Sequence, residues 1–306
     1  MRDRPGGDPG LSMRPQVIIV ATLLLNATLF AVNFVVAIAS GSRAVLAQAI
    51  FTITDLVGAA LLLWGLYLSR RPASHEYQFG RGKERFFWAF VSIVVTFTVA
   101  GVLALTEGVD QIIAPEALRH LDEALLVVAA TLAVSIVSVW VTLRELRLGR
   151  LTLSHLLESA NQGLKSIFYQ DLVSIVASVA ALAGLLVVYQ TGDAFADGVS
   201  AAAEGLLLIA MGFVLTRESR EYLIGRGLEP AEARGMLAVV ERNAAVAKVR
   251  SFQSMLLGPD DALLALKINF QDGMTTDQLE TAIDQVTASL RAAYPVLRHI
   301  VIEPES

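Results

Sequence analysis

Long apolar runs separated by short polar joints occupy the first two thirds of the chain. Each run is long enough to cross about 30 Å of hydrocarbon, because an α-helix rises about 1.5 Å per residue. The first run also exceeds the apolar part of a signal peptide, and no small-residue cleavage pattern closes it. The pattern predicts six transmembrane helices, the first from Val17 and the others at Arg43–Leu68, Phe86–Ile113, Leu121–Leu143, Gly163–Val188 and Phe195–Leu215.

Shorter periodic segments replace the apolar runs after Gly225. Residues 229–243 have apolar positions at helical spacing and Pro230 in the first turn, which predicts a helix. Residues 248–258 and 262–273 predict two strands around a Gly-Pro-Asp-Asp turn. An amphipathic helix opened by a Thr/Asp cap and a last strand follow, at residues 275–295 and 297–304. The order αββαβ is typical of a ferredoxin-like α+β domain.

The predicted fold class is therefore an α-helical membrane protein, with six transmembrane helices followed by a small cytoplasmic ferredoxin-like α+β domain. We expect a cytoplasmic tail at residues 1–14, the transmembrane domain at residues 15–218 and the αββαβ domain at residues 227–306.

Arginine and lysine predict the orientation, because the cytoplasmic joints of membrane proteins carry an excess of them. They gather in the N-terminal tail and after the second, fourth and sixth runs, whereas the opposite joints carry few. We expect an integral, multi-pass protein with both termini in the cytoplasm, in a bacterial inner membrane.

The composition agrees with a membrane protein. Of the 306 residues, 55% are hydrophobic and 17% are charged, and the mean hydropathy is +0.59, whereas a soluble domain has about a quarter charged residues. The net charge is -5 and no basic stretch alternates with aromatic residues, so we expect the lipid bilayer as a partner and no nucleic acid. The chain has no cysteine, which excludes thiolate metal sites and thiol nucleophiles. Hydrolase motifs are also absent from the sequence, so we do not expect an enzyme.

Two acids lie inside apolar runs, Asp55 in the second and Asp171 in the fifth. An ionised side chain at the centre of a membrane helix costs at least about 2.5–3.5 kcal/mol, so each acid must face a partner or water. Gln48 and Thr52 share a helix face with Asp55, and Gln170 precedes Asp171. Two acids with oxygen-bearing neighbours suit a divalent cation or a proton relay. Hydrogen bonding to neighbouring helices, or pairing with a nearby lysine, is the competing interpretation.

Several motifs carry a family resemblance. They are "SHEYQFGRGKERFFWA" (residues 74–89), "YLIGRGLEP" (residues 222–230), "SMLLGPDDALLALKINF" (residues 254–270), and two acids, Glu107 near the end of the third run and Asp197 at the start of the sixth. With six runs and an α+β tail, nearly the whole chain resembles the cation diffusion facilitator family, to which zinc transporters belong. It is most similar to the branch typified by the mitochondrial zinc transporter.

The resemblance implies a homodimer that exports a divalent metal, usually zinc, in exchange for protons. It also implies two metal ligands four residues apart on each of the second and fifth helices. This chain keeps Asp55 and Asp171, but Phe51 and Ile167 occupy the other two positions. Family members often carry acids at the positions of Glu107 and Asp197, and we expect these two residues to serve helix packing, electrostatics at the mouth of the site or gating.

With only two of the four implied metal ligands present, several functions stay open. The two carboxylates suit Mn²⁺ or Mg²⁺ as well as zinc, with Gln48, Thr52, Gln170 and water as auxiliary ligands. We expect no permanently bound cofactor, since the metal is the transported substrate. The alternatives are a site that binds only protons, a non-transporting or regulatory paralogue, and an unrelated six-span function.

Three residues outside the runs are candidates for a peripheral metal site. His155 and Glu158 are spaced to share a helix face between the fourth and fifth runs, where a solvated helix is the competing interpretation. His299 lies on the last predicted strand, where some family members bind a regulatory metal at the dimer interface.

Overall fold

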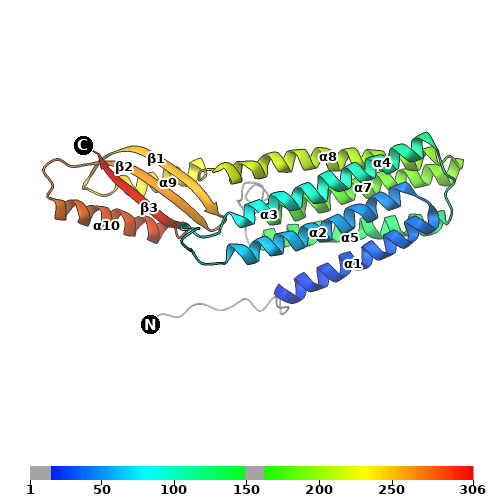
Figure 1. The fold of residues 1–306 in the computed structure, drawn as a ribbon, viewed down its shortest axis with the longest axis horizontal. Coiled ribbons are helices and arrows are strands. Elements are labelled where there is room, and N and C mark those ends of the chain that lie inside the picture. Colours follow the sequence, from blue (N-terminus) through cyan, green and yellow to red (C-terminus); the bar gives the residue numbers. More distant parts are fainter. Residues whose placement is uncertain (1–14, 149–161, 306) are drawn as a thin grey trace. The chain divides into compact units, whose positions relative to one another are not determined.

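The first part of the fold is a set of long helices (Figure 1). The computed structural model describes residues 15–148 and 162–305. Within these ranges, five helices have the length and hydropathy of a membrane span, and the apolar stretch Asn26–Ser40 belongs to another helix. The prediction of a multi-pass helical membrane protein is thereby confirmed. The helices are α1 (Pro15–Ser40), α2 (Arg43–Ser69), α3 (Glu84–Ile93), η1 (Val94–Val99), α4 (Ala100–Ile113), α5 (Leu121–Leu148), α7 (Gln162–Thr191) and α8 (Phe195–Ile224).

The third and sixth spans differ most from the sequence prediction. The third span is interrupted by η1, a π-helical segment between α3 and α4. The sixth span was expected to end at Leu215, but α8 continues to Ile224. Charged residues end its apolar stretch without ending the helix, because Tyr222 on the next turns is buried against Phe86, with 5.2 Å between ring centroids.

The C-terminal part has the predicted order αββαβ. It comprises α9 (Pro230–Glu241), β1 (Val246–Gly258), β2 (Asp261–Phe270), α10 (Thr276–Ala293) and β3 (Leu297–Glu305). The sheet order is β1-β2-β3, with β1 and β2 antiparallel and β2 and β3 parallel. A parallel pair requires a long crossover, which α10 provides. Its N-terminus has the expected cap: the Thr275 hydroxyl accepts from the Gln278 backbone N–H, and the Gln278 side chain accepts from the Thr275 N–H.

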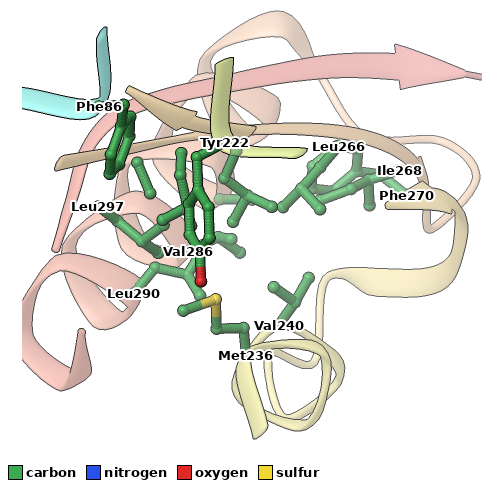
Figure 2. Close-up of a cluster of buried hydrophobic side chains, with 14 residues drawn as sticks. Phe86, Tyr222, Met236, Val240, Leu266, Ile268, Phe270, Val286, Leu290 and Leu297 are labelled. Atoms are coloured by element: carbon green, nitrogen blue, oxygen red, sulfur yellow. The ribbon is translucent and has the colours of Figure 1, made fainter. Parts of the chain in front are cut away.

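The chain divides into two compact units. The first takes its described residues from Met1–Gly58, Val95–Gly149 and Phe168–Gly212, and the second from Ala59–Val94, Arg150–Ile167 and Phe213–Ser306. Figure 2 shows the apolar core of the second unit, where Phe86 of α3 and Tyr222 of α8 join side chains of the sheet and of α9 and α10. The loop after α2 and the helix ends near it therefore belong to the same folded unit as the C-terminal domain.

Glycines allow α4 and α8 to lie in close contact within the first unit. They recur every seven residues, at Gly101 and Gly108 on α4 and at Gly198, Gly205 and Gly212 on α8. A Cβ atom on Gly205 would lie 2.7 Å from the carbonyl oxygen of Gly101, and one on Gly108 would lie 2.8 Å from that of Gly198. Small residues allow the backbones of membrane helices to approach in this way.

We expect the substitution Gly205→Ala to destabilise the protein by about 1–3 kcal/mol, because the new methyl group has no room and the backbones must separate. Thermal unfolding in detergent measures the effect. Ala203→Val is the matched control, since Ala203 is exposed on the same helix. Equal melting temperatures for Gly205→Ala and the unmodified protein would contradict the close contact.

Candidate functional site

Asp55 lies on α2 and Asp171 on α7, two helices joined by the hydrogen bond from the Gln48 side chain to Ser178, and the charge of Asp171 acts on Asp55. Two further helices supply hydrogen-bond donors to the pair. The side-chain amide of Asn26 on α1 donates to Asp55 Oδ2 at 3.4 Å, and the hydroxyl of Ser138 on α5 donates to Asp171 Oδ2 at 2.5 Å. Polar side chains from four apolar helices therefore converge on two carboxyl groups.

A line of polar side chains continues from Asp171 along α7. Ser174 shares a 2.8 Å hydrogen bond with Ser135 of α5, and Ser178 accepts from the Gln48 side chain of α2 at 3.4 Å. Gln48 is only 3% exposed, and its Oε1 has no hydrogen-bond partner among the described residues. Gln48 Oε1 is therefore an oxygen atom available as a metal ligand in the same bundle as the two acids.

Two other proposed auxiliary ligands are less directly placed. The hydroxyl of Thr52 donates to the backbone carbonyl of Gln48 at 2.8 Å, a bond within its own helix. Gln170 is buried, but within the described part of the chain it makes no hydrogen bond to Asp55 or Asp171. Adjacent helical residues do not face each other, so Gln170 and Asp171 occupy different faces of α7.

Phe51 packs as part of an aromatic contact. Its ring is buried and its centroid lies 6.2 Å from that of Phe97 in η1. The same two segments exchange hydrogen bonds: the Thr96 hydroxyl donates to the Thr54 carbonyl at 3.2 Å, and the Thr54 hydroxyl lies 3.5 Å from the Thr96 carbonyl. The π-helical segment therefore contacts α2 beside Asp55, and π-helical turns occur frequently at functional sites.

The acids Glu107 and Asp197 hold the joint between α1 and α2. Asp197 is fully buried and accepts from the Ser42 hydroxyl and from the Arg43 backbone N–H, both at 2.6 Å. It thereby satisfies free N–H groups at the start of α2, as a capping carboxylate does. Glu107 forms an ion pair with the Arg43 side chain at 2.6 Å. Both acids thus have a packing and electrostatic role.

Glu204 is a buried acid that the sequence analysis did not identify. It lies on α8, is 1% exposed, and neither carboxyl oxygen has a hydrogen-bond partner among the described residues. Leaving a carboxyl group unpaired in an apolar interior is costly. The signal was present in the sequence, because Glu204 is an acid near the middle of an apolar run, as Asp55 is.

The remaining predicted site residues are His299, His155 and Glu158. His299 lies on β3 with its Nε2 3.9 Å from Asp261 Oδ1. No group of three or more His, Cys, Asp or Glu side chains suited to a metal ion occurs within the described ranges. His155 and Glu158 lie outside the described residues, and so does the side chain of Ile167.

The transmembrane part of the chain matches the cation efflux transmembrane domain over residues 19–224. The chain belongs to the cation efflux family. This confirms the resemblance to the cation diffusion facilitators, whose members are built on the same helical domain.

Named relatives place the chain within the family. Metal tolerance protein C4 of Arabidopsis thaliana is 23% identical over 261 residues, covering 84% of this chain and 57% of the relative. The mitochondrial proton-coupled zinc antiporter SLC30A9 of Homo sapiens is 20% identical over 267 residues, covering 86% and 47%. Magnetosome protein MamM of Magnetospirillum gryphiswaldense is 28% identical over 114 residues, covering 37% and 35%. The chain spans about half the length of the first two relatives and lies near the SLC30A9 branch.

Proposed function

We propose that the protein transports a divalent cation of the zinc type across a membrane in exchange for protons. Asp55 and Asp171 hold the transported ion. The observation that carries the proposal is that these two acids lie on different helices of one apolar bundle, where the charge of Asp171 acts on Asp55 and side chains of α1 and α5 donate hydrogen bonds to the two carboxyl groups. A relative named as a proton-coupled zinc antiporter supports the choice of ion and of coupling.

The charge of the site favours a divalent ion. Two carboxylates close together in a medium of low dielectric constant repel each other and lose hydration. One divalent cation balances both charges. Asn26 and Ser138, which donate hydrogen bonds to the two carboxyls, also carry oxygen atoms. The Asn26 amide, after rotation, and the Ser138 hydroxyl can each bind the ion through a lone pair on its oxygen.

Protons provide the same charge balance when the cation is absent. A metal ion binds the deprotonated carboxylate, so its arrival releases any proton on Asp55 or Asp171. Release of the metal allows both groups to take up protons again. Exchange of metal for protons therefore needs no group beyond the two acids themselves.

Ion choice depends on the donor set. The candidate metal ligands near the pair, among the described residues, are all oxygen atoms, which suit Mn²⁺ and Mg²⁺. Zinc also binds carboxylates, together with nitrogen or sulfur ligands. The relatives' names favour zinc. We propose zinc as the principal substrate, and the homodimer, the cytoplasmic termini and the bacterial inner membrane stay predictions.

The proposal predicts zinc uptake by vesicles that contain the purified protein and carry an imposed proton gradient. A zinc indicator and a pH indicator inside the vesicles measure both movements, and protein-free vesicles give the background. We expect zinc uptake that collapses with the proton gradient, and weaker uptake of manganese and magnesium. Absence of flux for all three ions with folded protein would favour the non-transporting alternative.

A further inference from the structure

A hollow of about 570 Å³ lies in the second unit, whereas Asp55 and Asp171 belong to the first. Its wall consists of the end of α2, the loop that follows it, the turn between β1 and β2, and the start of β3. The loop is held against the sheet by close contacts. A Cβ atom on Gly82 would lie 3.3 Å from Gly258 Cα, and the Phe79 ring lies 5.1 Å from that of His299. The hollow is therefore a feature of the folded unit, with a volume typical of ligand sites.

Arginine dominates the charge of this wall. Five arginines and two aspartates line the hollow, a net charge of +3 with histidine neutral: Arg70, Arg71, Arg81, Arg85, Arg298, Asp260 and Asp261. The excess of arginine on this side of the chain is usual for a cytoplasmic joint. That rule places the residues near the membrane surface but does not require them to surround one hollow.

Both aspartates already have cationic neighbours. Asp260 pairs with Arg85 at 3.3 Å. Asp261 lies 3.9 Å from His299, and burial raises its pKa although His299 and Arg298 act to lower it. A metal cation at Asp261 would face the positive charge of Arg298, so the hollow is poorly suited to a metal.

Three arginines have no acidic partner within the described part of the chain: Arg70, Arg71 and Arg81. Two of them are oriented by aromatic rings. The Arg81 guanidinium lies 4.0 Å from the centroid of the Tyr77 ring, and that of Arg71 lies 5.7 Å from the centroid of Tyr67. A guanidinium that contacts an aromatic ring and no acid keeps N–H groups for other acceptors, and these N–H groups match the oxygens of a phosphate.

The source of the phosphate is indicated by the helix that leads into the hollow. Trp64 and Tyr67, on the last turns of α2, are 50% and 59% exposed. Exposed Trp and Tyr at the end of a membrane helix lie at the level of the lipid headgroups. Basic pockets at this level bind anionic headgroups.

We propose that this hollow is a binding site for the phosphate of an anionic phospholipid headgroup, held by Arg70, Arg71 and Arg81. The bound headgroup links the end of α2 to the loop that packs on the C-terminal domain. Phosphate is the recognised group, and inorganic phosphate is its other source.

The test uses the full chain, purified in a zwitterionic detergent, with thermal unfolding and direct binding as readouts. The probes are short-chain phosphatidylglycerol, short-chain phosphatidylcholine and inorganic phosphate. The Arg70→Gln/Arg71→Gln/Arg81→Gln variant removes the proposed contacts. The matched control is Arg234→Gln/Arg242→Gln/Arg250→Gln, which makes the same charge change at exposed positions of the C-terminal domain outside the hollow.

We expect phosphatidylglycerol, and not phosphatidylcholine, to raise the melting temperature of the unmodified protein and of the control variant. In the hollow variant the affinity for phosphatidylglycerol falls by at least about tenfold, as for the loss of one charge-assisted phosphate contact. The single variants Arg71→Gln and Arg81→Gln give the same comparison if the triple variant does not fold.

Equal affinity in the hollow and control variants would overturn the site. Both lipids carry a phosphate, but only the phosphatidylglycerol headgroup has a net negative charge. Equal effects of the two lipids would overturn the preference for an anionic headgroup. Tight binding of inorganic phosphate that displaces phosphatidylglycerol from the hollow would support the phosphate site and overturn the lipid as its source.

Discussion

Replacing either Asp55 or Asp171 by asparagine is expected to reduce zinc transport at least about 100-fold, because a carboxylate–cation contact in a low-dielectric site is worth several kcal/mol and each 1.4 kcal/mol is about tenfold. The exchange keeps the size of each side chain and removes one negative charge. With only one carboxylate left, a divalent ion carries an uncompensated charge inside the bundle. The vesicle assay measures the loss, and titration calorimetry in detergent measures binding separately.

Asp110→Asn is the control for this experiment. Asp110 lies on α4 and is exposed, so the same chemical change there does not touch the acid pair. We expect its transport to equal that of the unmodified protein. Zinc binding that survives in the Asp55→Asn/Asp171→Asn variant would mean that the ion is held elsewhere.

The second large expected effect concerns stability: replacing two buried acids of α8 by leucine is expected to change the free energy of unfolding in opposite directions. Asp197 and Glu204 of α8 are both buried acids, but the first accepts hydrogen bonds at the start of α2 and the second has no partner among the described residues. Asp197→Leu leaves buried donors unpaired, which lowers the free energy of unfolding by about 2–4 kcal/mol. Glu204→Leu removes an unpaired polar group from an apolar interior, which raises it by about 1–3 kcal/mol. Thermal unfolding in detergent compares the two variants.

The two variants serve as each other's control, since both place leucine on the same helix. Melting temperatures that move in the same direction would contradict the difference in hydrogen bonding. Transport by the Glu204→Leu variant is informative in addition. A more stable but less active protein would show that the buried carboxyl is retained for the transport cycle, and full activity would exclude such a role.

The two acids could be predicted because a charge inside an apolar run is rare and costly. Their hydrogen-bond donors could not, because an uncharged Asn26 or Ser138 in a membrane helix costs little and occurs often. Which turn of α5 meets Asp171 depends on helix packing, which the periodicity of one helix does not determine. Glu204 could have been predicted by the rule that identified Asp55 and Asp171.

The helices and the C-terminal domain were predicted almost completely, since apolar length, capping residues and strand alternation are local signals. The end of α8 was not, because it depends on the contact of Tyr222 with Phe86, far away in sequence. The π-helical turn in the third span was also missed. Its exchange of hydrogen bonds with α2 involves Thr54 and Thr96, and no pattern within either run requires it.

The cap that Asp197 provides for α2 has a consequence for biogenesis. Ser42 and Asp197 are 155 residues apart, so α8 leaves the ribosome long after α2. At about 5–20 residues per second the delay is roughly 8–30 s. During this interval the first N–H groups of α2 must be satisfied by water at the membrane surface. The joint between α1 and α2 therefore closes late in synthesis, and in a nascent chain stopped before α8 the first N–H groups of α2 lack their carboxylate partner.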